Sequence, residues 1–291
     1  METKRKHNQK KLSKRIGNTL IHLFLAVLSI IWVMPVFWII LTSLRAERGS
    51  YVNTFLPKGY TLDNYIRLFT ETNVLNFPKM FGNTLIIAIF TCLISTFFVM
   101  SVSYSLSRRR FAMRKPYMNM AMILGLFPGF MSMIAMYYIL KALGLTEGSM
   151  VRVALIIVYS AATGLGFQIT KGFFDVIPKS IDEAAIVDGA TQWQIFTKII
   201  MPLSKPIIIY TVMTSFMGPW VDFIFAKVLV RANSDQFTVA IGLWNMLQKE
   251  YINEYFTIFA AGAVVVSIPI AILFIYMQKF YVEGMAGAVK G

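Results

Sequence analysis

Carboxylate side chains are rare in this apolar sequence, and three of them gather in one stretch. Asp182, Glu183 and Asp188 lie within seven residues of PKSIDEAAIVDGATQWQIFTKIIMPL, residues 178–203. Hydrolysis at membrane depth would need paired Asp residues, Ser with His, or a cluster of metal ligands, and the apolar segments hold none of these. Asp182 and Glu183 instead suit the first turn of a helix, where negative charge complements the helix dipole. We therefore expect this stretch to contact another protein and not to catalyse a reaction.

Few other residues are of a type that could take part in catalysis or ligand binding. A phosphate-binding loop would read Gly, four residues, Gly, Lys and then Ser or Thr, and the run GLGFQITKG has neither this spacing nor a preceding strand. Met131, Met133 and Met136 cluster, but without Cys or His partners they predict packing and not a metal path. Cys92 is expected to be a packed apolar residue, and His22 is expected to lie at the membrane interface. No catalytic residue, cofactor or metal is expected.

Composition indicates a membrane protein. Of 291 residues, 57% are hydrophobic and 14% are charged, which is more apolar and less charged than a soluble domain of this length. The net charge of +14 is compatible with nucleic-acid binding. However, the basic residues form short runs beside apolar segments, as expected where Lys and Arg fix the orientation of membrane helices.

The apolar segments predict an all-α polytopic membrane protein with six transmembrane helices. A span needs roughly 17–25 apolar residues. The expected spans are Ile16–Leu44, Met80–Ser107, Pro116–Leu140, Val153–Thr170, Pro206–Val221 and Tyr255–Gln278. The fifth reaches full length only if Asp222 lies at its outer end and residues 223–226 complete it.

Lys and Arg counts predict the orientation. The N-terminal tail, SRRRFAMRKP, the region around residues 178–203 and the C-terminal tail carry seven, five, four and two of these residues. With six spans these segments share one side, so both termini and residues 178–203 are expected in the cytoplasm. The loops 45–79 and 227–254 then face outside, and their aromatic content predicts small folded caps.

Residues 178–203 carry the signals of two short helices joined by a turn. Ser180 and Glu183 have the spacing of a capping box, and Gly189 suits a C-cap. Thr191 and Gln194 form a second possible capping box before a helix over 192–201 that Pro202 would stop. A small-residue face (Ile181, Ala184, Ala185, Asp188) is expected to face a partner, and a bulky face (Trp193, Phe196, Ile199, Ile200) to pack on the spans.

The same stretch resembles the EAA loop of bacterial ABC-importer permeases. That pattern is Glu-Ala-Ala, three residues, Gly, nine residues, Ile, one residue, Leu-Pro. The chain matches it at Glu183, Ala184, Ala185, Gly189, Ile199 and Pro202, with Met201 in place of Leu. The resemblance implies a coupling helix that docks on a cytosolic ATPase subunit through Ser180, Glu183, Ala184, Ala185, Asp188 and Gly189.

The resemblance extends along the chain. LDNYIRLF (62–69), FGNTLIIA (81–88), WVDFIFAKVLV (220–230) and YVEGMAGAVKG (281–291) resemble segments of the MalG-type permease subunits of maltose and maltodextrin importers, although Val221 stands where Asn is common. It implies the type I ABC importer permease fold. The implied partners are a MalF-type permease, a MalK-type ATPase dimer, an extracytoplasmic sugar-binding protein and membrane lipid.

Three further sets of candidate residues follow. Trp220 and Asp222 lie at a Gly-Pro break and are candidates for the translocation path, with an ordinary interfacial carboxylate as the alternative. By resemblance, the loop with Trp244, Asn245, Gln248 and Tyr251 would contact the binding protein, unless it is a solvated cap. Likewise the tail with Gly284, Gly287, Lys290 and Gly291 would contact the ATPase subunits, unless it is a frayed terminus. Its glycines predict that it is not a stable helix.

The expected organisation is a basic tail (1–18), a first span (19–44), an outer loop (45–79), a permease core (80–280) and a C-terminal tail (281–291). A permease for another sugar or a polyol remains an alternative. An enzyme acting on lipid-linked sugar lacks its catalytic groups, and a secondary carrier lacks the intramembrane charges that such carriers use.

Overall fold

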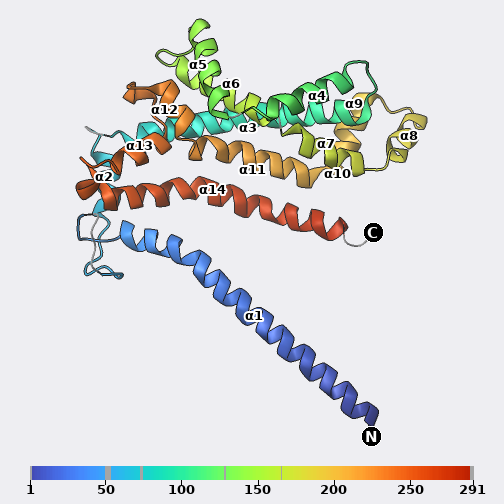
Figure 1. Cartoon of the computed structure of the whole chain (residues 1–291), viewed down its shortest axis with the longest axis horizontal. Coiled ribbons are helices and arrows are strands. Elements are labelled where there is room, and N and C mark those ends of the chain that lie inside the picture. Colours follow the sequence, from blue (N-terminus) through green and yellow to red (C-terminus); the bar gives the residue numbers. More distant parts are fainter. Residues whose placement is uncertain (1, 50–53, 73–74, 128, 165, 289–291) are drawn as a thin grey trace. The chain divides into compact units, whose positions relative to one another are not determined.

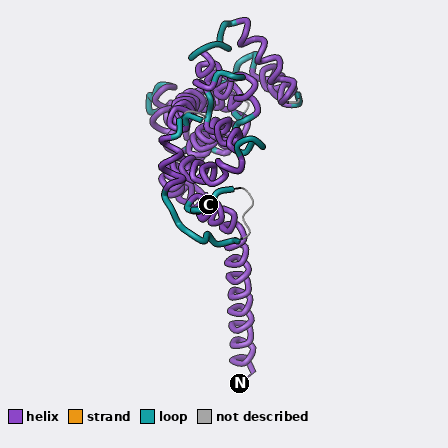
Figure 2. The backbone as a smooth tube through the Cα atoms, turned by 90° about the vertical axis from the view of Figure 1, so that its left-hand side faces the viewer, coloured by secondary structure: helices purple, strands orange, loops and turns teal. Residues whose placement is uncertain are grey.

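The computed structural model describes residues 2–49, 54–72, 75–127, 129–164 and 166–288. These residues are almost entirely helical, and no β-strand occurs among them (Figure 2). An isolated antiparallel bridge pairs Arg45 with Tyr60. The expected all-α class is therefore confirmed. The chain divides into two compact units, residues 1–68 with 246–264 and residues 69–245 with 265–291, and each is described by itself.

The larger unit is built around α3 (Phe77–Arg108), against which α6 (Met150–Gly164), α7 (Phe167–Val176) and α11 (Lys205–Val221) pack (Figure 1). Asn76 caps the start of α3 by accepting a hydrogen bond from the backbone N–H of Lys79 at 3.0 Å. The buried face of α3 includes the small residues Ala88, Thr91, Ser95 and Ser103. Small side chains let helix backbones approach closely in a membrane, which explains how one helix accommodates three neighbours.

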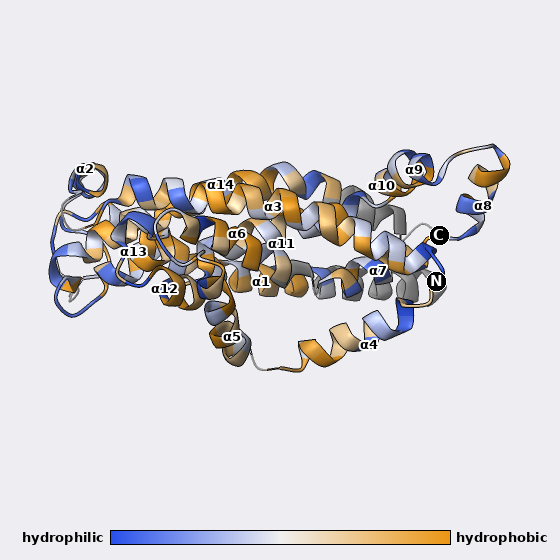
Figure 3. Cartoon of the chain, turned by 90° about the horizontal axis from the view of Figure 1, so that it is seen from above, coloured by the Kyte–Doolittle hydropathy of each residue, from blue (hydrophilic) through white to orange (hydrophobic). Residues whose placement is uncertain are grey.

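Three helices are long and apolar enough to cross a bilayer in the described residues. They are Gly17–Ser43 within α1 (Glu2–Ser43), α3, and Ile252–Phe280 within α14 (Ile252–Ala288). Two bent pairs raise the number to five: α4 (Arg114–Gly125) with α5 (Gly129–Ala142), and residues 192–203 with α11. In Figure 3, α4 changes from hydrophilic at its first residues to hydrophobic at its end.

The expected third and fourth spans are divided. The third corresponds to α4 and α5, and the fourth to the short apolar helix α6 followed by α7. The first helix also begins earlier than expected, because α1 includes residues 2–18 of the basic tail.

The helix before the fifth span also differs from expectation. It comprises α9 (Gln192–Gln194), a π-helical segment η1 (Ile195–Ile200) and α10 (Met201–Leu203), and it meets α11 at an angle of 81°. The prediction that Pro202 stops this helix is wrong, because the helix ends at Leu203. In the π-turn, the Met201 N–H donates to the Phe196 carbonyl. This wider spacing accommodates Pro202, which has no N–H to donate.

The fifth span ends at Val221, so the expected continuation through residues 223–226 is wrong. Asp222 has extended backbone, and its carboxylate accepts hydrogen bonds from the N–H groups of Phe225 and Ala226 at 3.3 and 3.2 Å. It thereby caps a separate helix, α12 (Ile224–Val230). The 3-10 helix η2 (Ser234–Gln236) and α13 (Val239–Met246) follow, and Asn83 of α3 donates to the carbonyls of Asp235 and Phe237 at 2.9 and 3.1 Å.

The smaller unit folds around buried polar groups. Arg45 is 1% exposed, and its guanidinium donates to the carbonyls of Thr54 and Phe55 at 2.9 Å each. Asn64, in α2 (Asp63–Thr70), donates to the carbonyls of Ser43 and Arg45 at 3.0 and 2.8 Å. These bonds satisfy the backbone where α1 ends, so the described residues of this loop form the small cap expected from the sequence.

The C-terminal tail corrects another expectation. Helix α14 continues past Gln278 to Ala288, so Gly284 and Gly287 lie in a helix, and the prediction of a non-helical tail is wrong. Glycine costs about 1 kcal/mol per residue in a helix, but extending an existing helix avoids the cost of nucleation. Lys290 and Gly291 lie outside the described residues.

Candidate functional site

Helix α8 (Ser180–Val187) forms the first half of residues 178–203, the segment with three carboxylates. Its N-cap is Lys179, and no side chain caps it, so the predicted capping box of Ser180 and Glu183 is wrong. Ser180 is already the first helical residue and is therefore one position too late to cap. Asp182 and Glu183 do lie in the first turn, where they complement the helix dipole as expected.

An ion pair ties α8 to the end of α3. The Asp182 carboxylate lies 3.3 Å from the Arg108 guanidinium, and both side chains are largely buried. Arg108 also donates to the carbonyl of Ile177 at 2.8 Å. Burial raises the pKa of the Asp182 carboxyl, while the neighbouring Arg108 charge acts in the opposite direction. The pair was not foreseen, because Arg108 is one of three consecutive arginines and lies 74 residues before its partner.

The turn after α8 has the predicted glycine conformation. Gly189 has φ +82°, a left-handed value that favours glycine. The N–H of Gly189 donates to the Ile186 carbonyl at 3.0 Å, and the N–H of Ala190 donates to the Ala185 carbonyl at 2.9 Å. This pair of bonds is a Schellman motif, which ends the helix and reverses the chain.

The second helix starts at the predicted capping box. The Thr191 N–H donates to the Gln194 side chain at 2.7 Å, and the Gln194 N–H donates to the Thr191 hydroxyl at 3.3 Å. Beyond it, the apolar side chains pack against α3 and α7 in one cluster: Val99, Met100, Tyr104, Phe174, Ala185, Ile195 and Ile200. The Phe196 ring lies 4.7 Å from the Tyr104 ring. The expected anchoring is confirmed, except that Trp193 is 67% exposed.

The exposed face of α8 differs from the one predicted. Ala185 is only 7% exposed and belongs to the anchoring cluster, so it is not part of an outward surface. Exposed side chains are Glu183, Ala184, Ile186, Val187 and Asp188, and we call this set the α8 face. Val187 is 87% exposed and Ile186 51%. An anchored helix with two exposed aliphatic side chains beside carboxylates is suited to contact another protein.

Trp220 and Asp222 have different surroundings in the structure. Trp220 is 3% exposed and packs on Phe81, with ring centroids 5.3 Å apart. Asp222 instead lines a cavity of about 640 Å³ and accepts a hydrogen bond from the Tyr159 hydroxyl at 2.6 Å. Met133 and Met136 line the same cavity, which was not foreseen. Of the two candidates for the translocation path, Asp222 is therefore the one next to open space.

The four loop candidates fall in both units. Trp244 is half exposed, and its ring lies 4.9 Å from the ring of Phe223. Asn245 is the next residue of α13 and is partly buried. In the smaller unit, Gln248 is exposed, and Tyr251 packs edge-on against Tyr255 with centroids 6.0 Å apart.

Comparison with known proteins identifies the family. Residues 100–286 match the model of the family described as binding-protein-dependent transport system inner membrane component. The chain is 33% identical over 271 residues to the galactooligosaccharides transport system permease protein GanQ of Bacillus subtilis, covering 93% of this chain and 94% of the relative. It is 31% identical over 286 residues to the maltodextrin transport system permease protein MalD of Streptococcus pneumoniae, covering 98% and 100%.

A solved structure shows the same fold. It is described as a bacterial ABC transporter involved in the import of the acidic polysaccharide alginate, and one of its chains aligns with a TM-score of 0.75. The alignment covers 92% of this chain and 98% of that chain at 22% identity, so it confirms the expected permease fold and carries no further conclusion. The family match over residues 100–286, with relatives at 33% and 31% identity over nearly the whole chain, establishes that this chain belongs to the binding-protein-dependent transport system inner membrane components.

Proposed function

We propose that the chain is a permease subunit of an ATP-driven importer for an oligosaccharide, with α8 as the helix through which an ATPase moves it. The observation that carries this proposal is the construction of residues 178–203. The segment is anchored on α3 by buried apolar contacts and the Arg108–Asp182 pair, and it leaves the α8 face exposed. A rigid connection of this kind transmits a push at α8 to the ends of the spans.

The proposed orientation places both termini and α8 in the cytoplasm. It rests on the excess of Lys and Arg in the segments that would share this side, with seven in the N-terminal tail and five between residues 107 and 116. Loops 45–79 and 227–254 then face a sugar-binding protein. Within the second loop, Trp244, Asn245, Gln248 and Tyr251 are the proposed contact residues.

The proposed assembly contains a MalF-type permease, a MalK-type ATPase dimer and the binding protein. Ser180, Glu183, Ala184, Asp188 and Gly189 would meet the ATPase directly or shape α8 for it, while Ala185 would anchor it. Gly284, Gly287, Lys290 and Gly291 would extend the ATPase contact. Asp222 would lie beside the sugar path, which the cavity it lines supports.

Maltose or maltodextrin is the proposed substrate, because MalD is a maltodextrin permease similar to this chain over nearly its whole length. Galactooligosaccharides are the second candidate, because GanQ is similar to the same degree. Deleting the gene and measuring uptake of labelled maltotriose and of labelled galactotriose separates the two. Loss of maltotriose uptake alone, restored by the intact gene, is the expected result. Loss of galactotriose uptake alone would assign the second substrate, and unchanged uptake of both would contradict the oligosaccharide proposal.

A further inference from the structure

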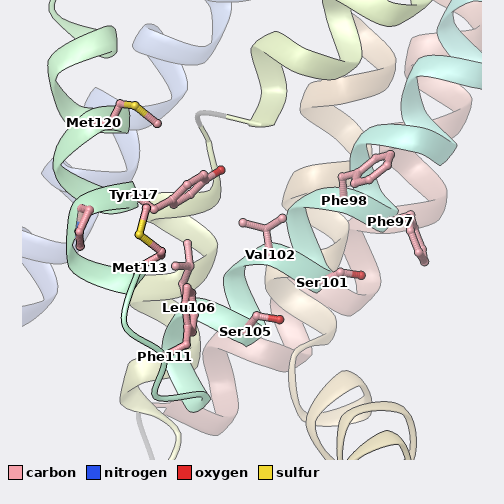
Figure 4. Close-up of a pocket in the computed structure, with 11 residues that line it drawn as sticks. Phe97, Phe98, Ser101, Val102, Ser105, Leu106, Phe111, Met113, Tyr117 and Met120 are labelled. Atoms are coloured by element: carbon pink, nitrogen blue, oxygen red, sulfur yellow. The ribbon is translucent and has the colours of Figure 1, made fainter.

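An apolar groove lies between α3 and the segment that leads into α4. It has a volume of about 540 Å³, and its lining includes Phe97, Phe98, Val102, Phe111, Met113 and Tyr117. Figure 4 shows side chains of α3 on one side of the groove and those of residues 111–120 on the other. Among the described residues, no charged side chain lines it. The groove therefore suits a flexible hydrocarbon ligand.

A second pocket, lined in part by basic residues, continues this groove toward the end of α3. The pocket has a volume of about 780 Å³ and shares Ser101, Ser105 and Phe111 with the apolar groove. Its other lining residues include Arg109 and Arg110 after α3, and Gln192 and Trp193 at the start of the second helix of residues 178–203. In the part of the chain that the structure describes, no carboxylate lines this pocket. One continuous depression is thus apolar in one part and basic in the other.

The two arginines of the pocket are available for a ligand. Arg108 is engaged by Asp182 and the Ile177 carbonyl, whereas Arg109 and Arg110 are exposed and pair with no carboxylate among the described residues. Arginine suits phosphate because its planar guanidinium donates two parallel hydrogen bonds. Trp193, which is 67% exposed, adds an indole of the kind that lies at the level of lipid headgroups.

We propose that this depression binds an anionic phospholipid, with its phosphate at Arg109 and Arg110 and one acyl chain in the apolar groove. The dimensions agree. From Phe97 to its end at Arg108, α3 rises about 17 Å, and one leaflet of the hydrocarbon core is about 15 Å thick. The apolar groove, the boundary serines and the arginines therefore follow the order of acyl chain, glycerol and headgroup in one leaflet.

The site adjoins the proposed coupling segment, so this inference deepens the proposed function and rests on it for its consequence. The headgroup would bridge the end of α3 and the helix that starts at Gln192. That helix and α8 are held in one apolar cluster. Bound anionic lipid would therefore stiffen the base of α8, and coupled ATP hydrolysis would depend on it.

Lipid retention tests the binding step without requiring transport. The protein is extracted from its membrane with its natural partners, exchanged into nanodiscs of phosphatidylcholine with phosphatidylglycerol, stripped with mild detergent and analysed by native mass spectrometry. Because Arg109 and Arg110 would each lose charge-assisted hydrogen bonds to the phosphate, the double variant Arg109→Gln/Arg110→Gln is expected to bind phosphatidylglycerol about thirtyfold more weakly. The double variant Lys115→Gln/Lys198→Gln, which removes the same charge from exposed residues outside both pockets, is expected to retain it.

A second variant and a cross-link identify the occupant. Ser105→Trp fills the point shared by the two pockets and is expected to lower retention without changing charge. A photo-crosslinking residue at Met113 is expected to label phosphatidylglycerol. Equal retention by both double variants, or cross-links from Met113 only to another protein chain, would overturn the lipid site. These results leave the proposed function untouched, since that is judged by sugar uptake.

Discussion

At the scale of single residues, local geometry and long-range pairing contribute differently to α8. Gly189 and the Thr191–Gln194 box act within a few positions of themselves, so their structures follow from the sequence. The Arg108–Asp182 pair joins two helices and has no local signature. Likewise, whether Ala185 faces inward or outward is decided by the cluster under α8 and not by its small size. The wrong prediction about Ala185 therefore has a tertiary cause.

Substitution at Gly189 tests the turn. Gly189→Ala is expected to weaken α8 by about 1 kcal/mol, because alanine is strained at positive φ. Nothing lies within 4 Å of the added methyl, so crowding does not contribute. Sugar-stimulated ATP hydrolysis by the purified complex should fall, while Gly189→Asn should retain most of it because asparagine tolerates this conformation. Gly172→Ala is the matched control, with open space and no positive φ, and a loss of equal size in that variant would refute the explanation.

At the scale of elements, the sequence predicts where the membrane helices lie but not where each helix is interrupted. Apolar runs show where helices form, and α3 and α14 agree closely with the expected second and sixth spans. The end of α4 at Gly125 and the separate helix after Asp222 were missed, because they depend on how each helix packs and on which backbone groups find partners. Asp222 illustrates this, since its carboxylate caps α12, so residues 223–226 do not complete the fifth span.

The α8 face yields a prediction about association. Val187 is 87% exposed, and an interface that buries it gains about 1.5–3 kcal/mol. Val187→Asp should therefore weaken binding of the ATPase at least tenfold, measured by co-purification over a concentration series. Val176→Asp on α7 changes a valine that is 82% exposed and lies outside the α8 face, so it serves as the control. If both variants bind the ATPase like the unmodified chain, α8 is not the docking helix.

At the scale of the whole molecule, the proposed function makes the chain a pathway that depends on partners for energy and for substrate capture. The all-α fold and the family were predictable from the spans and the EAA pattern, because both are features of sequence spacing. The substrate was not, since relatives at 33% and 31% identity serve different oligosaccharides. We propose that sugar choice depends on a few side chains around cavities such as that beside Asp222, and sequence spacing does not reveal such cavities.

The C-terminal tail is expected to affect coupling in the assembled importer. Truncation after Tyr281 removes the last part of α14 and the residues beyond it. If the tail contacts the ATPase subunits, the truncated chain should still insert but should hydrolyse ATP with less sugar transported per ATP. The ratio of sugar uptake to ATP hydrolysis in proteoliposomes measures this. An unchanged ratio would show that the tail is dispensable for coupling.

Docking of α8 on an ATPase can be detected by site-specific cross-linking. Cys92 is the chain's only cysteine, so Cys92→Ala gives a background without thiols. In that background Ala184→Cys, on the α8 face, is labelled with a photoreactive maleimide in native membranes, and Lys58→Cys, in the loop proposed to face outside, is the control. If α8 docks as proposed, position 184 is expected to cross-link to a nucleotide-binding ATPase subunit and position 58 is not. A permease whose position 184 reacts only with lipid or water, while sugar uptake persists, would contradict it.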